Sequence, residues 1–578
     1  MSELAGLSTD MTEMVIQTLR QVVERELPDE RILELDEKDE FPIDLIRHLL
    51  SDDVGLHLIF LPEEVGGLGG GARDICRVSE EMARADLGVA TAFLAICLGT
   101  DPILVGGTET QRAHWLARIA EEGLIVAYGV TEPEAGSNVA ALRTTATPVT
   151  DASGQVTAYR LNGTKQFITN GGVAELYTIL AKAPGGPSFF IVERDTPGLT
   201  AGKTEEKHGI RASNTTGVFL EDVEVPVAQL IGGEEGQGLK QANAVFGYTR
   251  LMVGAFGLGA GQAALDRALE YARVREQFGA ALIEKEGYAL RLLVPNWIAL
   301  AAGRAYTEEI ALRIDQGEKD LQVEGSIAKL WCTEAGVRAT DDALQALGGY
   351  GYTREYMVEK YRRDVRITSI YEGTSEIQRN IIGLYRWKEN VRAKGAMYDG
   401  IASELEALHA ARGDLGADRA ATALREAAAV IDYCHRARLT KHQMVLFEIA
   451  DLVMRGEVAA ALVRKAARKV EAGDADAPVF AAMSRVFARQ TLEALATGAR
   501  LCCTGFATGA AGATGAASAT GAASATGAAD ATGAADAITA GSDAAAFLDE
   551  HLRRIGVGTL AGQWVDMNRI ADSFKIVA

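Results

Sequence analysis

The hydrophobic period of the chain changes twice, and these two changes limit the folds that are open to it. From about Thr9 to Glu122, apolar residues recur every three or four positions, as in helices that bury one face. Near Val126 the period becomes two, which is typical of strands, and near Gly236 the spacing of long helices returns. We therefore predict an α+β fold that is mostly α, with the strands confined to one middle segment.

The length and the charge of the chain exclude several classes of protein. With 578 residues, 48% of them hydrophobic and 24% charged, the chain can bury a large core and is too long for one ordinary domain. The 79 acidic and 58 basic residues give a net charge of −21, which would repel nucleic acid. The N-terminus is acidic where a signal peptide is basic, and no run of about 18 apolar residues is evident. We expect a cytoplasmic protein that does not bind nucleic acid.

The cysteines and histidines predict no metal site. The six cysteines form no CxxC pair, and the eight histidines show no HxxxH or HExxH spacing. Free thiols in a reducing compartment are the simplest interpretation.

Turn signals divide the middle segment into strands. Asn162-Gly163, between two alternating runs within Val156 to Thr169, is typical of a type I′ hairpin turn. Further strands are expected at Leu176 to Ala181, Ser188 to Val192 and Gly217 to Val225.

The stretch from Tyr361 to Leu384 offers a carboxylate at the start of a helix. Glu372 follows an apolar pair and precedes a glycine, and Ser375 with Gln378 has the form of a capping box. Most glutamates in loops are simply solvated, so the pattern alone does not assign a catalytic role.

Several segments, in the same order, resemble the acyl-CoA dehydrogenases, which are flavoenzymes that remove two hydrogens from the α and β carbons of an acyl-CoA thioester. The matching motifs are LPEEVGGLG at 61–69, TEPEAGS at 131–137, TKQFITN at 164–170, RVREQFG at 273–279 and IYEGTSEIQR at 370–379. The resemblance covers roughly 45–387. It implies an N-terminal helical domain at 1–125, a middle antiparallel β domain at 126–235 and a helical flavin and catalytic domain at 236–390.

The resemblance also implies the parts of an active site. The family glutamate that matches Glu372 removes the α-proton. The implied contacts with FAD in the same subunit are Tyr128, Val130, Thr131, Gly136, Ser137, Phe167, Thr169, Thr374 and Glu376. The implied substrate contacts are Ser137, Thr249, Arg250, Tyr371 and Gly373, with Ala90 and Leu94 at the blind end of the acyl pocket.

A further set of residues matches family positions that reach the FAD of a neighbouring subunit. These residues are Arg275, Phe278, Gln345, Gly348 and Gly349. The resemblance therefore implies a homo-oligomer, either a dimer or a tetramer, and in this family the electron acceptor is electron-transferring flavoprotein.

Glycines punctuate the third helical segment. Gly254, Gly257 and Gly261 are spaced by three and four residues and follow no strand, so they predict close packing of two helices rather than a dinucleotide-binding loop. Pro295 should kink the helix in which it lies.

Residues 391–578 form an extension that only larger relatives have. Helices are expected at Ser403 to Ala411, Arg419 to Ala437, Leu446 to Met454, Val458 to Val470, Val479 to Ala496 and Ala544 to Arg554. A basic face around Arg464 and Lys469 is better explained as a solvated face than as a peripheral membrane contact. The ATGAA repeats at 507–536 lack the apolar side chains of a core and predict a flexible linker.

The sequence leaves the acyl group open. Because Ala90 and Leu94 are small or apolar, we expect a medium- or long-chain straight acyl-CoA, as in fatty-acid β-oxidation, with a short branched or carboxylated acyl-CoA as the alternative. An acyl-CoA oxidase, an enoyl-CoA reductase and a non-catalytic assembly protein of the same fold are further alternatives.

Overall fold

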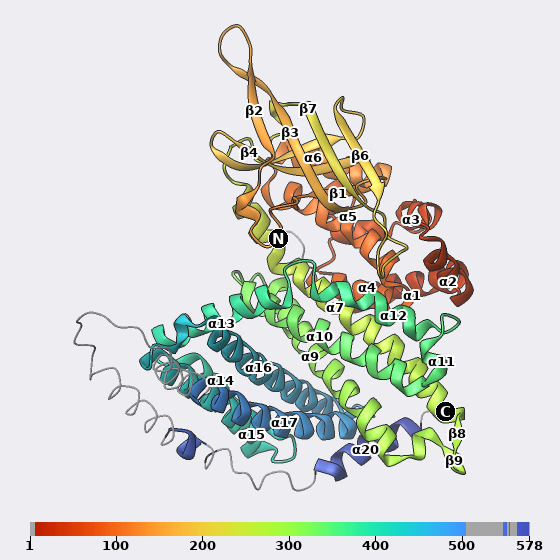
Figure 1. Ribbon diagram of the computed structural model, residues 1–578, viewed down its shortest axis with the longest axis vertical. Helices are drawn as coiled ribbons and strands as arrows, with labels where there is room; N and C mark the ends of the chain where they lie inside the picture. Colours follow the sequence, from red (N-terminus) through yellow and green to blue (C-terminus); the bar gives the residue numbers. More distant parts are fainter. Residues whose placement is uncertain (1–5, 505–546, 552–553, 555–562, 577–578) are drawn as a thin grey trace, which may run out of the picture. The chain divides into compact units, whose positions relative to one another are not determined.

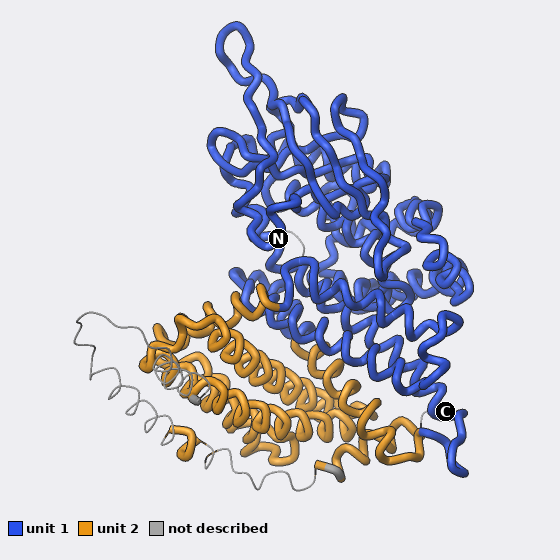
Figure 2. Tube along the Cα trace, in the orientation of Figure 1, with its two compact units in different colours: residues 1–282, 307–375 blue, residues 283–306, 376–578 orange. Residues whose placement is uncertain are grey.

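The computed structural model describes residues 6–504, 547–551, 554 and 563–576. These residues form two compact units, which Figure 2 shows in different colours. Unit 1 comprises 1–282 and 307–375, and unit 2 comprises 283–306 and 376–578. The predicted linker at 507–536 lies outside the described residues, and the four domain ranges given above stay a prediction.

Unit 1 begins with helices that bury the long helix α5 (Figure 1). They are α1 (Thr9–Glu26), α2 (Asp29–Lys38), α3 (Ile43–Leu50), α4 (Ala72–Ala85), α5 (Leu87–Gly106) and α6 (Glu109–Glu122). Asp86 caps α5, because its carboxylate accepts a hydrogen bond from the Val89 N–H at 2.8 Å. Nearly every residue of α5 is buried, which explains why the helix is apolar on all sides.

The prediction that no apolar run is long enough to cross a membrane was wrong for α5. By length and composition α5 passes that test, and it is the one helix that does so within the described residues. However, 89% of its most apolar window is buried within the protein, as in a core helix. Polar Asp101 and Thr100 interrupt the apolar run, and this hid it from a search for consecutive apolar residues.

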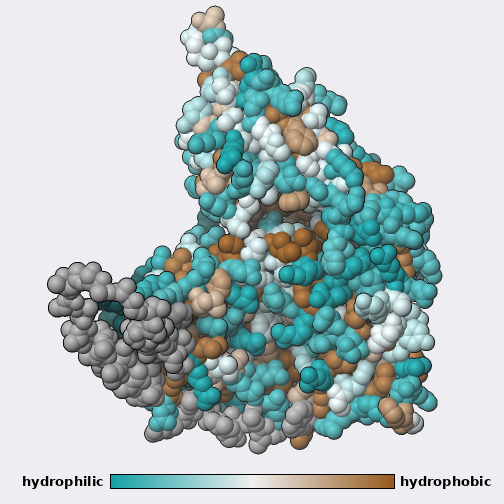
Figure 3. All heavy atoms as spheres, in the orientation of Figure 1, coloured by the Kyte–Doolittle hydropathy of each residue, from teal (hydrophilic) through white to brown (hydrophobic). Residues whose placement is uncertain are grey.

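A seven-stranded sheet follows. Its strands are β1 (Val126–Gly129), β2 (Thr145–Thr150), β3 (Val156–Thr169), β4 (Leu176–Ala183), β5 (Gly186–Glu193), β6 (Leu199–Thr204) and β7 (Thr215–Pro226). The order is β1-β4-β2-β3-β7-β6, with β5 paired to β4. Most pairs are antiparallel, but β1 runs parallel to β4, with Val126 opposite Leu176. Hydrophilic side chains predominate over this domain on the face that Figure 3 shows.

The predicted hairpin turn at Asn162-Gly163 is wrong, because β3 continues through it as one strand. The register between β3 and β7 shifts between Leu161 and Gly163, so the pair forms a bulge instead. The Asn162 side chain accepts from the Asp222 N–H at 2.9 Å across this bulge. A Cβ on Gly163 would lie 2.7 Å from the Thr144 Cα, so glycine here serves close packing rather than a turn.

Two parallel helices form the rest of the frame of unit 1. These helices are α7 (Gly238–Val274) and α10 (Gln322–Leu347), and they pack closely against each other. A Cβ on Gly257 of α7 would lie 2.6 Å from the Cys332 carbonyl oxygen of α10. A Cβ on Gly254 would lie 3.2 Å from the Ala328 carbonyl oxygen. The predicted close helix packing is thereby confirmed at these two glycines. The short strands β8 (Glu276–Gln277) and β9 (Ala280–Ala281) follow α7, and α11 (Gly349–Tyr352) and α12 (Met357–Val365) follow α10.

Pro295 lies in the first turn of a helix, directly after a wider turn, and the predicted kink stays a prediction. The short helix α8 (Glu286–Tyr288) leads into a π-helical turn at Ala289–Leu293, after which α9 (Val294–Asp315) begins. Proline cannot donate a main-chain hydrogen bond, so the wider turn lies directly before it.

Unit 2 holds the helices of the extension. They are α13 (Ser375–Arg392), whose first residue belongs to unit 1, α14 (Ala396–Ala411), α15 (Ala417–Arg436), α16 (Gln443–Ala472), α17 (Ala477–Thr504) and α20 (Gln563–Ile576). The two helices predicted between Leu446 and Val470 are one helix, because Gly456 does not break α16. A Cβ on Gly456 would lie 2.8 Å from Leu424 Cδ2, so this glycine allows α15 and α16 to approach.

Helix α20 lies beyond the last helix that the sequence predicted. Met567, Ile570, Ala571 and Phe574 are buried at the spacing of one helical face, and that pattern could have predicted it. The basic face of α16 is largely paired with acidic neighbours: Arg464 with Glu404 at 2.8 Å, and Lys469 with Asp476 at 2.8 Å. The apolar residues of α16 are buried, in agreement with a solvated face on a packed bundle.

Candidate functional site

The Glu372 loop, which connects α12 and its 3₁₀ turn to α13, has an unusual backbone. After α12, a 3₁₀ turn at Arg366–Ser369 leads to Glu372 and Gly373, whose φ angles are +54° and +87°. The left-handed region is unfavourable for glutamate, so the surrounding structure must hold the loop. Buried Lys329 of α10 does so in part, by donating from Nζ to the Gly373 carbonyl at 2.8 Å.

Two residues of α7 lie beside the Glu372 carboxylate, as the sequence predicted. The Thr249 hydroxyl donates to Glu372 Oε2 at 3.2 Å. The buried Arg250 guanidinium donates from Nη1 to Ser326 Oγ at 3.1 Å, which fixes its position. The structure thus brings Glu372, Thr249 and Arg250 together, although more than 120 residues separate them in the sequence.

The electrostatic environment suits a general base. Burial raises the pKa of Glu372, and the Arg250 charge, the Thr249 hydrogen bond and the Lys329 charge partly offset that rise. A carboxylate with a raised pKa is a stronger base than a solvated one and still ionises. No group of acidic, histidine or cysteine side chains suited to a metal occurs in the part of the chain that the structure describes.

Helix α5 supplies the predicted wall of the acyl pocket. Ala90 and Leu94 are buried one turn apart, and so lie on one face. The side chain of Asn170, at the end of β3, donates to the Ala92 carbonyl at 2.8 Å. The acyl-pocket helix is therefore tied directly to the second predicted flavin segment.

The two predicted flavin segments are fastened to each other. The Gln166 N–H donates to the Thr131 carbonyl at 2.9 Å. Next to this hydrogen bond in the sequence, the buried Lys165 ammonium pairs with Glu132 at 2.7 Å and donates to the Val130 carbonyl at 3.3 Å. The sequence analysis did not single out Lys165 and Glu132, although both belong to the quoted motifs. Their ion pair holds Val130 and Thr131 beside Phe167.

The residues at the rim of these segments have the character that a flavin site needs. Gly136 and Ser137 are exposed, and a Cβ on Gly136 would meet no atom within 4 Å, so a planar group can approach the backbone there. Phe167 is 63% exposed with a φ of +57°, and Thr169 is partly exposed at the end of β3. Tyr128 OH is buried without a hydrogen-bond partner among the described residues. These residues fit FAD, which would offer ring and phosphate oxygens to them.

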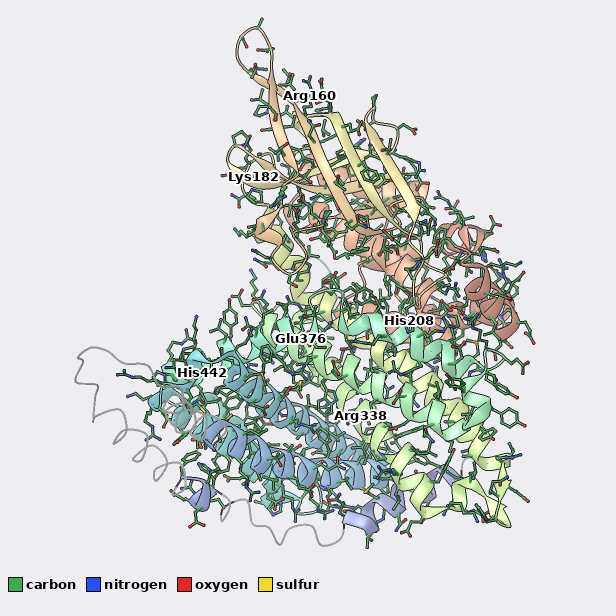
Figure 4. The ribbon with its side chains drawn as sticks, viewed as in Figure 1. Arg160, Lys182, His208, Arg338, Glu376 and His442 are labelled. Carbon is green, nitrogen blue, oxygen red and sulfur yellow. The ribbon has the colours of Figure 1, made fainter. Side chains whose placement is uncertain are left out.

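The remaining predicted contacts precede or begin α13. Tyr371 and Thr374 flank the Glu372-Gly373 pair and are partly exposed, and Ser375, which begins the helix, donates its hydroxyl to Glu334 at 2.5 Å. Glu376, labelled in Figure 4, is exposed in the first turn of α13.

The five residues predicted to reach a neighbouring subunit lie apart from Glu372. Arg275 is 26 residues beyond Thr249 on α7, or about 39 Å at the helical rise. Because α7 and α10 run parallel, Arg275 and exposed Phe278 lie at the same end as Gly348 and Gly349, where the Tyr271 and Tyr350 rings are 6.0 Å apart. Gln345 is exposed on the last turn of α10. The structure thus gathers this set into a second surface and does not bring it to the first site.

Comparisons with known proteins match the chain to three domain models of one family. They are the acyl-CoA dehydrogenase N-terminal domain over 9–123, the middle domain over 127–223 and the C-terminal domain over 236–384 and 398–513. An acyl-CoA dehydrogenase of Bacillus subtilis is 38% identical over 364 residues, which are 61% of this chain and 91% of that protein.

Solved structures extend the likeness to the whole chain. The butyryl-CoA dehydrogenase of Megasphaera elsdenii is 35% identical with a TM-score of 0.61, over 65% of this chain and 98% of that one. An acyl-CoA dehydrogenase complexed with FAD, from Bacillus anthracis, matches 98% of this chain and 95% of that one with a TM-score of 0.81. At 24% identity this last likeness shows the fold, and it includes the extension.

Proposed function

Because the chain belongs to the acyl-CoA dehydrogenase family, which is FAD-dependent, we propose that it oxidises an acyl-CoA thioester to the trans-2-enoyl-CoA with Glu372 as the base. The observation that carries this role is the position of the Glu372 carboxylate. It lies on a strained loop, 3.2 Å from the Thr249 hydroxyl and within the field of Arg250. Such an arrangement is typical of a functional carboxylate rather than a solvated one.

In the proposed mechanism, Glu372 takes the α-proton of the thioester. The Thr249 hydroxyl and the Arg250 charge keep the carboxylate ionised before the transfer, and burial makes it basic enough to react. The Glu372 backbone N–H is expected to donate to the thioester oxygen and so stabilise the developing enolate. Bound FAD supplies the acceptor for the β-hydrogen, which leaves as hydride.

Ala90 and Leu94 support a medium- or long-chain straight acyl group. Both are buried on one face of α5, where bulky polar side chains would shorten the pocket. A carboxylated acyl group is disfavoured, because the Glu372 carboxylate would repel its charge.

The proposed electron acceptor is electron-transferring flavoprotein. The exposed Phe167, next to the residues proposed to hold the flavin, supports an approach by a protein partner. The surface formed by Arg275, Phe278, Gln345, Gly348 and Gly349 supports a homo-oligomer in which a second copy contributes FAD contacts. Six buried free thiols fit a reducing compartment, and we expect the protein to act in the cytoplasm.

The test is anaerobic mixing of the purified yellow protein with acyl-CoAs of increasing chain length. We expect the flavin absorbance near ~450 nm to bleach, fastest with medium or long straight chains, and enoyl-CoA to form. A protein without flavin, or one that no acyl-CoA bleaches, would favour a non-catalytic assembly role. Rapid reoxidation by dioxygen with release of peroxide would favour an oxidase, and reduction of enoyl-CoA by the reduced protein would favour a reductase.

A further inference from the structure

The proposed acyl wall on α5 continues beyond Leu94 and becomes polar. Ala90, Leu94, Cys97 and Asp101 lie within about 60° of one another around the helix axis, at 100° per residue. All four side chains are buried. A straight acyl chain that follows this face therefore passes two apolar residues before it meets a thiol and a carboxyl group.

Asp101 is a buried carboxyl group with an unfilled hydrogen-bonding capacity. It is 2% exposed, and its Oδ2 has no hydrogen-bond partner among the described residues. It lies within α5, the one helix of the described residues that is long and apolar enough to cross a membrane. A buried polar group without a partner destabilises the fold, and such groups in native proteins generally serve a ligand or a catalytic role.

Other polar groups surround Asp101. The Tyr248 hydroxyl of α7 lies 2.8 Å from Cys97 Sγ and is engaged there. The Tyr128 hydroxyl of β1 is buried without a partner in the described structure, as Asp101 Oδ2 is. Burial is the main cause that raises the pKa of both tyrosines, and ionised Asp101 would raise it further. The Glu372 charge also raises the pKa of Tyr128, so Asp101, Tyr128 and Glu372 lie within electrostatic range of one another.

The protonation state of Asp101 decides which chemical group it can bind. Burial and the nearby Glu372 charge raise the pKa of Asp101 well above its usual range. A raised pKa favours the protonated form, and a protonated carboxyl group can both donate and accept a hydrogen bond. A carboxylate on the substrate would be repelled by the Glu372 charge, and an ammonium group would require two buried charges to form.

We propose that Asp101 forms a hydrogen-bonding end to the acyl pocket, and that the preferred substrate is a straight-chain acyl-CoA that carries a hydroxyl group on its chain. The inference rests on the proposed function and specifies its substrate class. A hydroxyl group fills both roles of the neutral carboxyl group, whereas an alkyl chain leaves Asp101 unpaired, so discrimination of about tenfold or more is expected.

The experiment measures kcat/KM for pairs of acyl-CoAs of equal length, with and without a terminal hydroxyl group, over a series of lengths. An ammonium-terminated series is included. With the wild-type protein we expect one length at which the hydroxylated member is preferred about tenfold or more. Equal efficiencies at every length, or a preference for the ammonium series, would overturn the proposal. If no acyl-CoA of any kind reduces the flavin, the proposed function itself fails.

Three variants assign the preference to Asp101. In Asp101→Leu, the ratio of kcat/KM for the hydroxylated substrate to kcat/KM for the plain substrate should fall to one or below. Asp101→Asn should retain most of the preference, since the amide also donates and accepts. Thr100→Val is the matched control, because Thr100 is equally buried on α5 and donates to the Ile96 carbonyl at 2.8 Å. Flavin content and FAD dissociation constants are measured for each variant. The proposal is contradicted if Asp101→Leu leaves this kcat/KM ratio unchanged. It is also contradicted if Asp101→Leu lowers the affinity for FAD without changing the ratio.

Discussion

Two buried regions, one in each unit, are built around a glutamate, and their hydrogen bonding is opposite. In unit 2, Glu457 of α16 is saturated. Arg386 donates to Oε1 at 2.8 Å and to Oε2 at 3.0 Å, Tyr398 donates to Oε1 at 3.0 Å and Tyr306 donates to Oε2 at 3.1 Å. In unit 1, Glu372 lies among buried polar atoms that have no partner within the described residues, namely Asp101 Oδ2, Tyr128 OH and Arg250 Nε.

The difference separates a structural carboxylate from one prepared for chemistry. Glu457 has its full set of partners inside the protein, so it holds helices together and offers nothing to a ligand. Around Glu372 the protein leaves donors and acceptors unfilled, which lowers stability and is retained only where a bound molecule completes the set. The same substitution at the two positions should therefore have opposite consequences.

Glu372→Gln should give the largest effect. The amide keeps the size of the side chain and removes its basicity, so flavin reduction by acyl-CoA should slow by at least ~10²–10⁴-fold. Stability and FAD content should stay near the wild-type values. Stopped-flow absorbance under anaerobic conditions measures the rate, and a wild-type rate with every bound acyl-CoA would remove Glu372 from its proposed role.

Glu457→Gln should have the reverse profile. The Arg386 side chain is only 5% exposed, and the substitution leaves its buried charge without a charged partner at position 457. We therefore expect the free energy of unfolding to fall by about 3 kcal/mol. Flavin reduction should continue near the wild-type rate in the folded protein. Urea unfolding measures the loss. If the free energy of unfolding is unchanged, or falls by the same amount in Glu457→Gln and Glu372→Gln, then the number of hydrogen-bond partners does not distinguish the two glutamates.

The pH dependence should follow the carboxyl groups near Glu372. The pKa values of Glu372 and Asp101 are raised in the folded protein, mainly by burial, so the folded state binds their protons more tightly than the unfolded state. Stability of the FAD-free protein should therefore fall as the pH rises from the ordinary carboxyl pKa through the raised values, by at most about 1.4 kcal/mol per pH unit for each group.

Flavin reduction should change in the opposite direction and increase with pH through the raised pKa of Glu372, because only the ionised carboxylate accepts a proton. Thermal unfolding and stopped-flow rates over the same pH series test both trends. A stability slope that Glu372→Gln does not reduce would show that other groups carry it.

Tyr398→Phe should give the smallest effect. It removes one of the hydrogen bonds to Glu457 and leaves the others, so the unfolding free energy should fall by about 1 kcal/mol. Tyr385→Phe, at the 47% exposed Tyr385 of α13, is the control for loss of a tyrosine hydroxyl. A loss larger than that of Glu457→Gln would indicate that the ring of Tyr398, rather than its hydrogen bond, carries the effect.

The sequence by itself determined the order of the domains and the identity of the base candidate. Helical and strand periods predicted which segments bury one face, and these periods depend only on backbone geometry. The motifs that contain Glu372, Thr131 and Phe167 indicated the family, because they are contiguous. Local signals failed at two glycines: Asn162-Gly163 predicted a turn, and two separate helices were predicted on either side of Gly456, yet both glycines allow close packing within one element.

Only the tertiary structure decided which distant side chains meet. The approach of Thr249 and Lys329 to the Glu372 loop depends on how α7 and α10 pack, and no spacing in the sequence encodes it. The same holds for Asp101, which the sequence shows as one acidic residue among 79 acidic residues. Its missing partner and its raised pKa arise from burial beside other elements, since desolvation depends on everything packed around a group and not on its neighbours in the chain.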